Sequence, residues 1–572
     1  MKTTLLTVAF IIIASMSNAQ NNAQAVDWAF NTGSANNRVM AIKYDSQGNV
    51  LALCSMTDSA SFSGATVVSP QTFGYPSTNY YIGKRNILGI GQILIERGSA
   101  TGNTYADFST FNLDAADNIF VGGATFSTGY NFGNSVNLSG KGYMIAKYNA
   151  NGLAQWAKLY NFGNSAINSY STDPWKLQTI ADGSVVAMLS AGNKFALIKI
   201  DALGNELWYK EYNLATNGYA STIKTSNNNF FVDAIGNITL SYNTAVNSGV
   251  PYLALNTDTV KLYNGNHSAV AFLLQFDANG NKKSYKGYRG SIGDLAVEYT
   301  TGNVLLNWTQ YGGQNNTAPM DSLPGNNLSF TNVYRGIVVI DSTGKFIKAS
   351  SYVITTMPDY KSILPLGGLK ALVTCKYFTN DALVAGAQNY SVSSGSVFVW
   401  EELDANLNPL HFLAAPIISK NNTTPENVMA AQGNKIAVCA TWQRADQLSI
   451  NVNGIVLTAN DKNTSFPTRY PAPFNTFADD VMIAQYDRTL QVTINNTMLS
   501  SDTKAIYPNP NNGTFTVISE NVGKKLTITD VAGKQVYSTT LTSVTQQIGV
   551  ELNAGIYLVK VGNNKVQKLI VE

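Results

Sequence analysis

Histidine, the side chain most often used for acid–base chemistry at neutral pH, is nearly absent from this sequence. The 572 residues contain only His267 and His411. Neither has a cysteine or carboxylate at the spacing of a zinc site, and a Ser-His-Asp triad would have to recruit one of the two. Surface or strand-end positions are the simpler interpretation of both. We therefore predict no catalytic, cofactor-binding or metal-binding residue.

Carboxylates offer a second source of chemistry, because a pair of them is the usual machinery of a glycosidase. Candidates are Asp294, Glu298, Glu401 and Glu402, but no pattern selects two of these. A polysaccharide-degrading enzyme therefore stays open as an alternative without a nominated pair.

Two acidic segments, 201–205 (DALGN) and 277–281 (DANGN), have the composition of calcium-binding loops. Neither has the full spacing or the closing glutamate of an EF-hand loop. Asp, Asn and Gly together are also typical of tight hairpin turns, since these residues tolerate positive φ. We predict hairpin turns at both places.

Aromatic rings provide the chemistry of sugar recognition, because they stack on sugar faces while amides bond the hydroxyls. Trp175, Trp308, Trp400 and Trp442 are the candidate ligand contacts. The alternative for all four is core packing, since large aromatic side chains usually fill interiors.

The composition limits the class of protein that must position these residues. Charged residues are only 13% of the chain, hydrophobic residues are 45%, and the net charge of +3 is not concentrated in clusters. Nucleic-acid binding needs a concentrated basic surface, so we expect none. Cys54, Cys375 and Cys439 form no CxxC pair or disulfide framework and are interpreted as buried thiols, although a Cys375–Cys439 bridge stays open.

The N-terminus has the pattern of a cleaved signal peptide. Lys2 supplies the positive charge, residues 5–14 are apolar, and small residues at 17 and 19 fit signal peptidase. We predict a signal peptide over 1–19, with cleavage after Ala19. The apolar stretch is too short for a stable transmembrane helix, and we expect no transmembrane segment in the mature chain.

A repeat runs through residues 20–494, which we predict to be one body. A turn followed by a short apolar strand recurs seven times, marked by Asn49, Asn118, Asp182, Asn237, Asn303, Gly368 and Asn434, at intervals of 55 to 69 residues. Most copies contain a second strand–turn–strand element, at 143–160, 195–212, 271–288, 336–352, 397–414 and 481–494, with a weaker version at 80–96. Two hairpins make four strands, so the fold class is all-β, with a seven-bladed β-propeller.

Closure of the ring would need a strand from the other end of the body. Residues 26–33 resemble the outer strand at 154–163, and we expect them to complete the last blade at about 424–494. Two packed sheets or a solenoid are the alternatives. The repeat resembles those of secreted bacterial β-propellers. Segment 200–208 is similar to quinone-dependent dehydrogenase repeats, but only Trp156 and Trp208 hold the tryptophan position, so a quinone is not expected.

Residues 505–572 have a different pattern, with alternating apolar residues that indicate a small β-sandwich. Residues 495–504 are polar and are predicted to be a linker. The matching positions are Pro508, Asn509, Pro510, Gly513, Asp530, Gly533, Gly555 and Tyr557, and over about 503–572 they closely resemble the type A C-terminal sorting domain of the type IX secretion system. The resemblance implies that these are recognition elements, with Gly555 in a turn and Tyr557 as a packing residue.

The resemblance also implies the destination and partners of the chain. It implies a host of the Bacteroidota type, contact with the outer-membrane machinery of type IX secretion, and a secreted location at the exterior of the outer membrane. Together with the few catalytic candidates, it favours a noncatalytic body for glycan or protein binding, or adhesion. A secreted polysaccharide-degrading propeller enzyme and a structural surface component are the alternatives.

Overall fold

The computed structural model describes residues 24–572 with gaps, of which the longest are 163–175, 217–229, 459–478 and 492–502. The predicted signal peptide and most of the predicted linker lie outside the described residues. All regular elements that the structure describes are β-strands. They form two compact units, Met1–Thr493 and Ile494–Glu572. Within the described residues, no helix is long or apolar enough to cross a membrane.

The body, which is the first unit, is built from seven sheets with a core of four antiparallel strands each. The first three comprise β2 (Arg38–Tyr44), β3 (Val50–Met56), β6 (Asn79–Arg85) and β7 (Gly91–Glu96); β8 (Ala106–Leu113), β9 (Ile119–Thr125), β12 (Gly142–Tyr148) and β13 (Ala154–Tyr160); and β14 (Lys176–Thr179), β15 (Val185–Ala191), β16 (Lys194–Ile200) and β17 (Glu206–Thr216).

The other four sheets follow in chain order. They comprise β18 (Phe230–Val232), β19 (Ile238–Thr244), β22 (Val270–Phe276) and β23 (Lys282–Arg289); β24 (Ser291–Val297), β25 (Val304–Tyr311), β28 (Val333–Ile340) and β29 (Phe346–Ala349); β30 (Asp359–Gly367), β31 (Lys370–Phe378), β34 (Ser396–Leu403) and β35 (Pro409–Phe412); and β37 (Met429–Gln432), β38 (Lys435–Gln443), β41 (Asp479–Gln491) and β1 (Gln24–Asn31).

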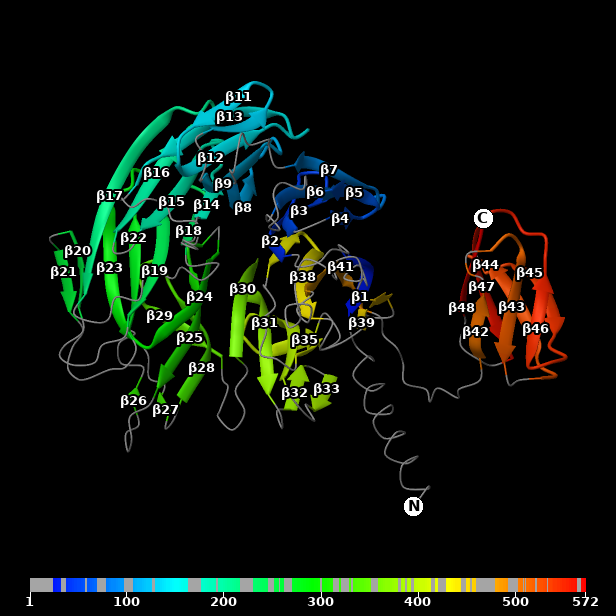
Figure 1. Ribbon diagram of the computed structural model, residues 1–572. Helices are drawn as coiled ribbons and strands as arrows, with labels where there is room; N and C mark the ends of the chain where they lie inside the picture. Colours follow the sequence, from blue (N-terminus) through cyan, green and yellow to red (C-terminus); the bar gives the residue numbers. More distant parts are fainter. Residues whose placement is uncertain are drawn as a thin grey trace, which may run out of the picture. The chain divides into compact units, whose positions relative to one another are not determined.

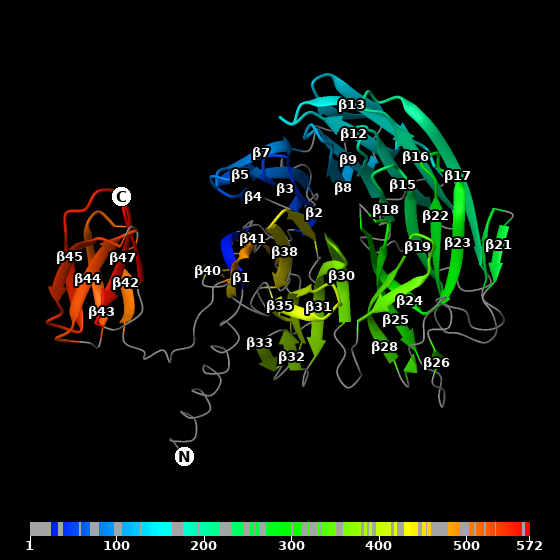
Figure 2. The same ribbon diagram turned by 180° about the vertical axis from the view of Figure 1, so that it is seen from behind.

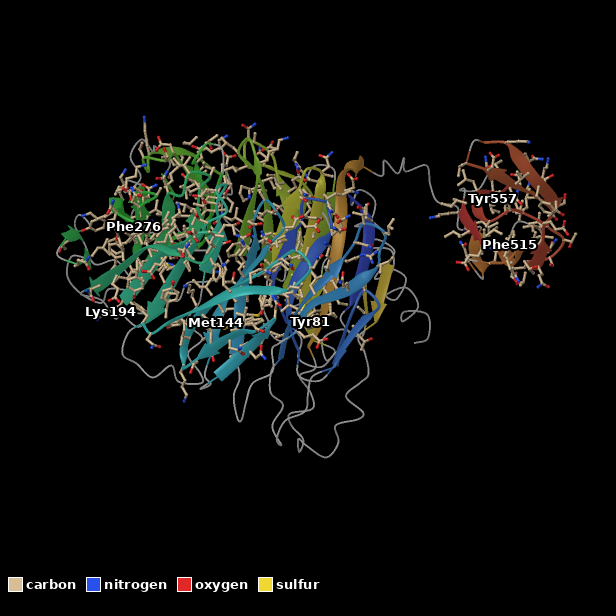
Figure 3. All side chains as sticks on the ribbon, turned by 90° about the horizontal axis from the view of Figure 1, so that it is seen from above. Tyr81, Met144, Lys194, Phe276, Phe515 and Tyr557 are labelled. Carbon is tan, nitrogen blue, oxygen red and sulfur yellow. The ribbon has the colours of Figure 1, made fainter. Side chains whose placement is uncertain are left out.

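The sheets follow one another around a common centre (Figures 1 and 2). Their first strands contact one another in the closed order β2, β8, β14, β18, β24, β30, β37 and back to β2. This is a β-propeller architecture, and it differs from both a solenoid and two packed sheets. Apolar clusters fill the spaces between neighbouring sheets, and Tyr81, Met144 and Phe276 are buried residues of three such clusters (Figure 3).

The last sheet closes the ring with a strand from the N-terminus. β1 pairs antiparallel with β41, with Ala29 opposite Ala484 and Asn31 opposite Met482. The side chain of Asp27 on β1 also accepts a hydrogen bond from Gln485 at 2.8 Å. This confirms the expected closing strand. The segment 481–494 differs from expectation, because β41 continues as one strand where a turn and second strand were predicted.

Short hairpins are inserted between the second and third strands of six sheets, and the sequence analysis did not predict them. They are β4 (Ser59–Phe62) with β5 (Ala65–Val68), β10 (Gly129–Gly133) with β11 (Val136–Ser139), β20 (Tyr252–Leu255) with β21 (Asp258–Lys261), β26 (Ala318–Pro319) with β27 (Ser329–Phe330), β32 (Ala382–Ala385) with β33 (Gln388–Ser391), and β39 (Ser449–Val452) with β40 (Ile455–Thr458). A further strand, β36 (Ile417–Ser419), pairs with β34. Four of these hairpins contact the fourth strand of their own sheet, through the pairs β5–β7, β11–β13, β32–β35 and β40–β1, whereas β20 pairs with β17 of the preceding sheet and β21 contacts β23.

The second unit is a sandwich of two antiparallel sheets. One contains β42 (Thr503–Tyr507), β43 (Thr514–Ser519) and β46 (Thr545–Gly549); the other contains β45 (Gln535–Thr540), β44 (Lys525–Asp530), β47 (Gly555–Val561) and β48 (Gln567–Val571). Phe515 and Ile548 from the first sheet and Leu526, Val559 and Leu569 from the second form one buried core. The alternating pattern of the sequence thus produces a sandwich with one buried face per sheet.

Candidate functional sites

The two segments with the composition of calcium loops are hairpin turns closed by their own aspartate. Asp201 Oδ1 accepts hydrogen bonds from the backbone N–H of Leu203 at 2.9 Å and of Asn205 at 2.7 Å, and its Oδ2 accepts the Asn205 side-chain amide at 2.9 Å. Asn205, through its side chain and its backbone, lowers the pKa of Asp201. Asp277 binds Asn279 and Asn281 in the same way. These carboxylates stabilise turns.

The same turns form the contacts between neighbouring sheets. The indole N–H of Trp156 donates to the carbonyl of Ala202 at 3.3 Å, and that of Trp208 donates to Ala278 at 3.2 Å. Gly280 has φ of +73°, and a Cβ there would lie 2.9 Å from the ring of Trp208. Glycine is therefore required both by the turn conformation and by the close ring. These two tryptophans hold one sheet to the next.

The four tryptophans proposed as ligand contacts are placed differently. Trp308 on β25 and Trp400 on β34 are only 0% and 2% exposed and belong to apolar clusters, which is the core-packing arrangement. Trp442 is a residue of β38. Trp175 lies outside the described residues, as does His267, and His411 is on β35.

The four candidate carboxylates are each engaged with separate partners. Asp294 on β24 accepts the backbone N–H of Ile363 on β30 at 2.8 Å, and Glu298 accepts the hydroxyl of Thr301 at 2.7 Å. Glu402 binds the guanidinium of Arg488. Adjacent residues of a strand point to opposite faces, so Glu401 and Glu402 diverge on β34.

The three cysteines are buried and free. Burial raises the pKa of the Cys54 thiol to about 12, so at neutral pH it is not a thiolate nucleophile. The thiol of Cys375 contacts Glu401 Oε2 at 3.4 Å, and that of Cys439 donates to the carbonyl of Val428 at 3.2 Å. This agrees with the interpretation as buried thiols, and no Cys375–Cys439 bridge is present.

Asn509 is one of the predicted recognition residues of the C-terminal sandwich, and its side chain bonds the backbone of the last strand. Its side-chain amide donates to the carbonyl of Lys568 at 2.7 Å, and its carbonyl oxygen accepts the N–H of Ile570 at 2.7 Å. Asn509 therefore pairs with the final strand β48 as another strand would. Pro508 and Pro510 lie outside the described residues.

Asn511 has a similar role, and the sequence analysis missed it. It is 6% exposed, donates from its side chain to the Ile570 carbonyl at 2.9 Å, and accepts the N–H of Gly513 at 2.8 Å. Gly513 has φ of +93°, and a Cβ would lie 2.6 Å from the carbonyl oxygen of Val550. The run of three asparagines at 509, 511 and 512 was the only available sequence signal.

The other predicted recognition residues form two local structures. The backbone carbonyl of Asp530 accepts the N–H of Gly533 at 3.0 Å, which closes a turn, and its side chain accepts the N–H of Lys534 at 2.9 Å. The hydroxyl of Tyr557 donates to the carbonyl of Asn553 at 2.8 Å, and its ring packs against the core (Figure 3). Gly555 begins strand β47 and is not a turn residue as expected.

The chain is similar to many solved structures, and β-propellers are among them. The "Dos1 propeller" is 12% identical with a TM-score of 0.30 and covers 82% of this chain and 96% of its own. PorZ of Porphyromonas gingivalis, a surface component of the type IX secretion system, is 9% identical with a TM-score of 0.20 over 93% of this chain and 81% of its own. The phage phi92 endosialidase is 9% identical with a TM-score of 0.34 over 96% and 87%. Likeness at this level carries no argument about function.

No curated protein matches the chain. A family model matches residues 505–572 and is described as "Secretion system C-terminal sorting domain". The matched residues cover the sandwich and include Asn509, which pairs with β48, and Gly513, which has a positive φ. Residues 505–572 are therefore a type IX secretion C-terminal sorting domain, and the chain that carries it is a secreted protein directed to the cell surface.

Proposed function

We propose that the body is a noncatalytic module that binds a glycan or protein at the cell surface. The observation that carries the proposal is the sorting domain, which engages the type IX secretion machinery and directs the body outside the cell. Two features of the body support it. Its sheets form a closed ring, and its candidate catalytic carboxylates are engaged in separate structural contacts.

We further propose the following organisation: a signal peptide over 1–19, a body of seven blades over 20–494, a linker over 495–504 and the sorting domain over 505–572. The seven sheets, each with a core of four strands, support the number of blades. We expect the sorting domain to be of type A, in a host of the Bacteroidota.

Ligand binding can be tested on the purified mature chain by thermal shift against polysaccharides, oligosaccharides and calcium, with a chelator as control. A ligand that binds only the folded state at a hundredfold excess over its Kd stabilises by about 2.7 kcal/mol. A dose-dependent shift without product formation supports binding. Turnover of the ligand would favour the enzyme, and no shift with any ligand would favour a structural component.

The surface address can be tested by deleting residues 503–572. We expect the truncated protein to accumulate in the periplasm, because the sorting domain is the signal that the outer-membrane machinery reads. Immunoblots of fractionated cells and antibody labelling of intact cells measure this. Surface labelling equal to that of the full chain would contradict the proposal.

A further inference from the structure

The first strands of the seven sheets surround the centre of the body, and some of their side chains point towards it. The turns after β2, β14 and β24 are each closed by a backbone N–H at the end of the strand that donates to a carbonyl beyond the turn, from Asp45 to Asn49, Ile180 to Ser184 and Glu298 to Asn303; the third turn is one residue longer. Positions on different first strands can therefore be compared by counting back from these turns. This places Lys176 on β14 and Asp294 on β24 at the same level, with Lys43 on β2 one step of the alternation nearer the turn.

Alternation along these strands separates a buried side from a partly exposed side. Ile42, Leu177 and Leu295 are buried in the apolar clusters between sheets. Lys43 and Lys176, which are next to Ile42 and Leu177, point the other way and are partly exposed. A β-bulge directly precedes Asp294, as well as the equivalent positions on β2, β8 and β30. Bulges of this kind re-aim the side chain that follows.

Three charges from non-adjacent strands act on one another in this place. Both Asp294 and Lys43 affect the ionisation of Lys176. In the ring of first strands, β8 lies between β2 and β14, and β18 lies between β14 and β24. The three side chains can therefore interact only across the centre of the ring. Surrounding protein lowers the pKa of Lys43, and it lowers that of Lys176 to about 8.

The one carboxylate among these three charged groups, that of Asp294, already accepts hydrogen bonds from the protein backbone. Asp294 accepts the N–H of Leu295 and the N–H of Ile363, each at 2.8 Å. Within the part of the chain that the structure describes, Lys43 and Lys176 have neither an ion pair nor a hydrogen-bond acceptor. Two ammonium groups beside a single carboxylate leave an excess of positive charge in surroundings that lower the pKa of both lysines, and an anion bound between the two lysines would offset it.

We propose that the centre of the ring binds a small ligand through an oxyanion, a carboxylate or a phosphate, with the ammonium groups of Lys43 and Lys176 as its contacts. The inference rests on the proposed binding role of the body and names the class of ligand. A sugar acid and a phosphate ester present the same charge to two lysines, so the experiment must distinguish them.

The test uses isothermal titration of the full mature chain with galacturonate, with inorganic phosphate and with neutral galactose, at pH 7 and constant ionic strength. We expect saturable binding of at least one anion and none of galactose. Lys43→Met and Lys176→Met keep an unbranched side chain of similar length and remove its charge, and each should weaken binding at least tenfold. Lys370→Met, at an exposed lysine of β31, is the matched control and should bind as the wild type does.

Binding unchanged in both inner variants, or no saturable binding of either anion, would overturn the inference. If a neutral glycan still raised the melting temperature in the thermal-shift screen, the proposed binding role would stand without it. Both inner substitutions remove a poorly solvated charge, so we expect folded proteins, and a thermal melt of each checks this.

A pH titration with galacturonate provides a second readout. The groups that face Lys176 are Lys43 and Asp294. Because the lowered pKa of Lys176 is about 8, this lysine loses its charge between pH 7 and pH 9 and affinity should fall about tenfold. In Lys176→Met this fall should disappear. An affinity independent of pH in the wild type would contradict the assigned role of Lys176.

Discussion

At the scale of single residues, asparagine side chains repeatedly take the place of a missing strand. Asn243 on β19 donates to the carbonyl of Ile292 at 2.7 Å and accepts its N–H at 2.9 Å, which links two neighbouring sheets. Asn509 does the same for the final strand of the sorting domain. A primary amide carries two N–H donors and a carbonyl acceptor, so one side chain can satisfy both an N–H and a C=O of backbone that no strand reaches.

The pairing at Asn509 leads to a stability prediction. Asn509→Ala removes two hydrogen bonds to β48, and at about 1 kcal/mol each it should destabilise the sorting domain by about 1 to 2 kcal/mol. Hydrogen exchange of the full chain should show faster exchange at β48 and little change in the body. The control is Asn553→Ala, whose exposed side chain lies outside this contact. Equal exchange rates at β48 in the two variants would show that the pairing of Asn509 does not stabilise the sorting domain.

At the scale of elements, the sequence predicted the regular hairpins but not the inserted ones. The expected element at 143–160 became β12 and β13, and the weak copy at 80–96 became β6 and β7. These strands are mostly seven residues long with clear turn residues, so their pattern is unambiguous. The inserted hairpins have strands of only two to five residues, too short for alternation to be recognised.

The packing of the inserted hairpins explains why they are present. Phe62 at the end of β4 is fully buried, and a Cβ on Gly83 of β6 would lie 2.3 Å from its ring. The outermost strand of a sheet leaves backbone groups unpaired and invites association with other chains. A hairpin that packs on this strand protects it. The sequence could not reveal this, since the partner glycine lies in a different hairpin.

The contact between a turn and the next sheet can be measured at Gly280. Gly280→Ala forces a Cβ against the ring of Trp208, and overpacking of this kind costs about 1 to 3 kcal/mol beyond the strain of positive φ. Gly368→Ala is the matched control, because φ there is +61° and nothing lies within 4 Å of the added carbon. Urea unfolding of both variants gives the difference. Equal free energies of unfolding would mean that the indole contact is not tightly packed.

At the scale of the whole molecule, ring closure depends on the first strand of the chain. The repeats predicted closure, and the similarity of 26–33 to another outer strand identified the residues. The central lysines were not predicted, because Lys43 and Lys176 become neighbours only when non-adjacent sheets meet around a centre. A site of this kind depends on how the sheets curve into a ring, and no local pattern in the sequence encodes that curvature.

Deletion of 24–31 tests the closing strand. Without β1, the backbone of β41 loses one of its two ladders, and Lys435 loses its ion pair with Asp27 at 2.6 Å. We expect a melting temperature lower by several degrees and concentration-dependent association through the exposed edge. Calorimetry and light scattering measure the two effects. An unchanged melting temperature together with a monomeric protein would contradict a closing role for β1.

The position of β41 also has a mechanical consequence. The chain leaves the body from this strand towards the sorting domain, and β41 lies between β38 and β1. If a cell is held at its surface through the C-terminal side of this protein, a pulling force enters the body along β41. Both ladders are then loaded in shear, so their hydrogen bonds must break together and not one after another. The pairing of β1 with β41 that closes the ring thereby also resists the extraction of β41 from the body under load.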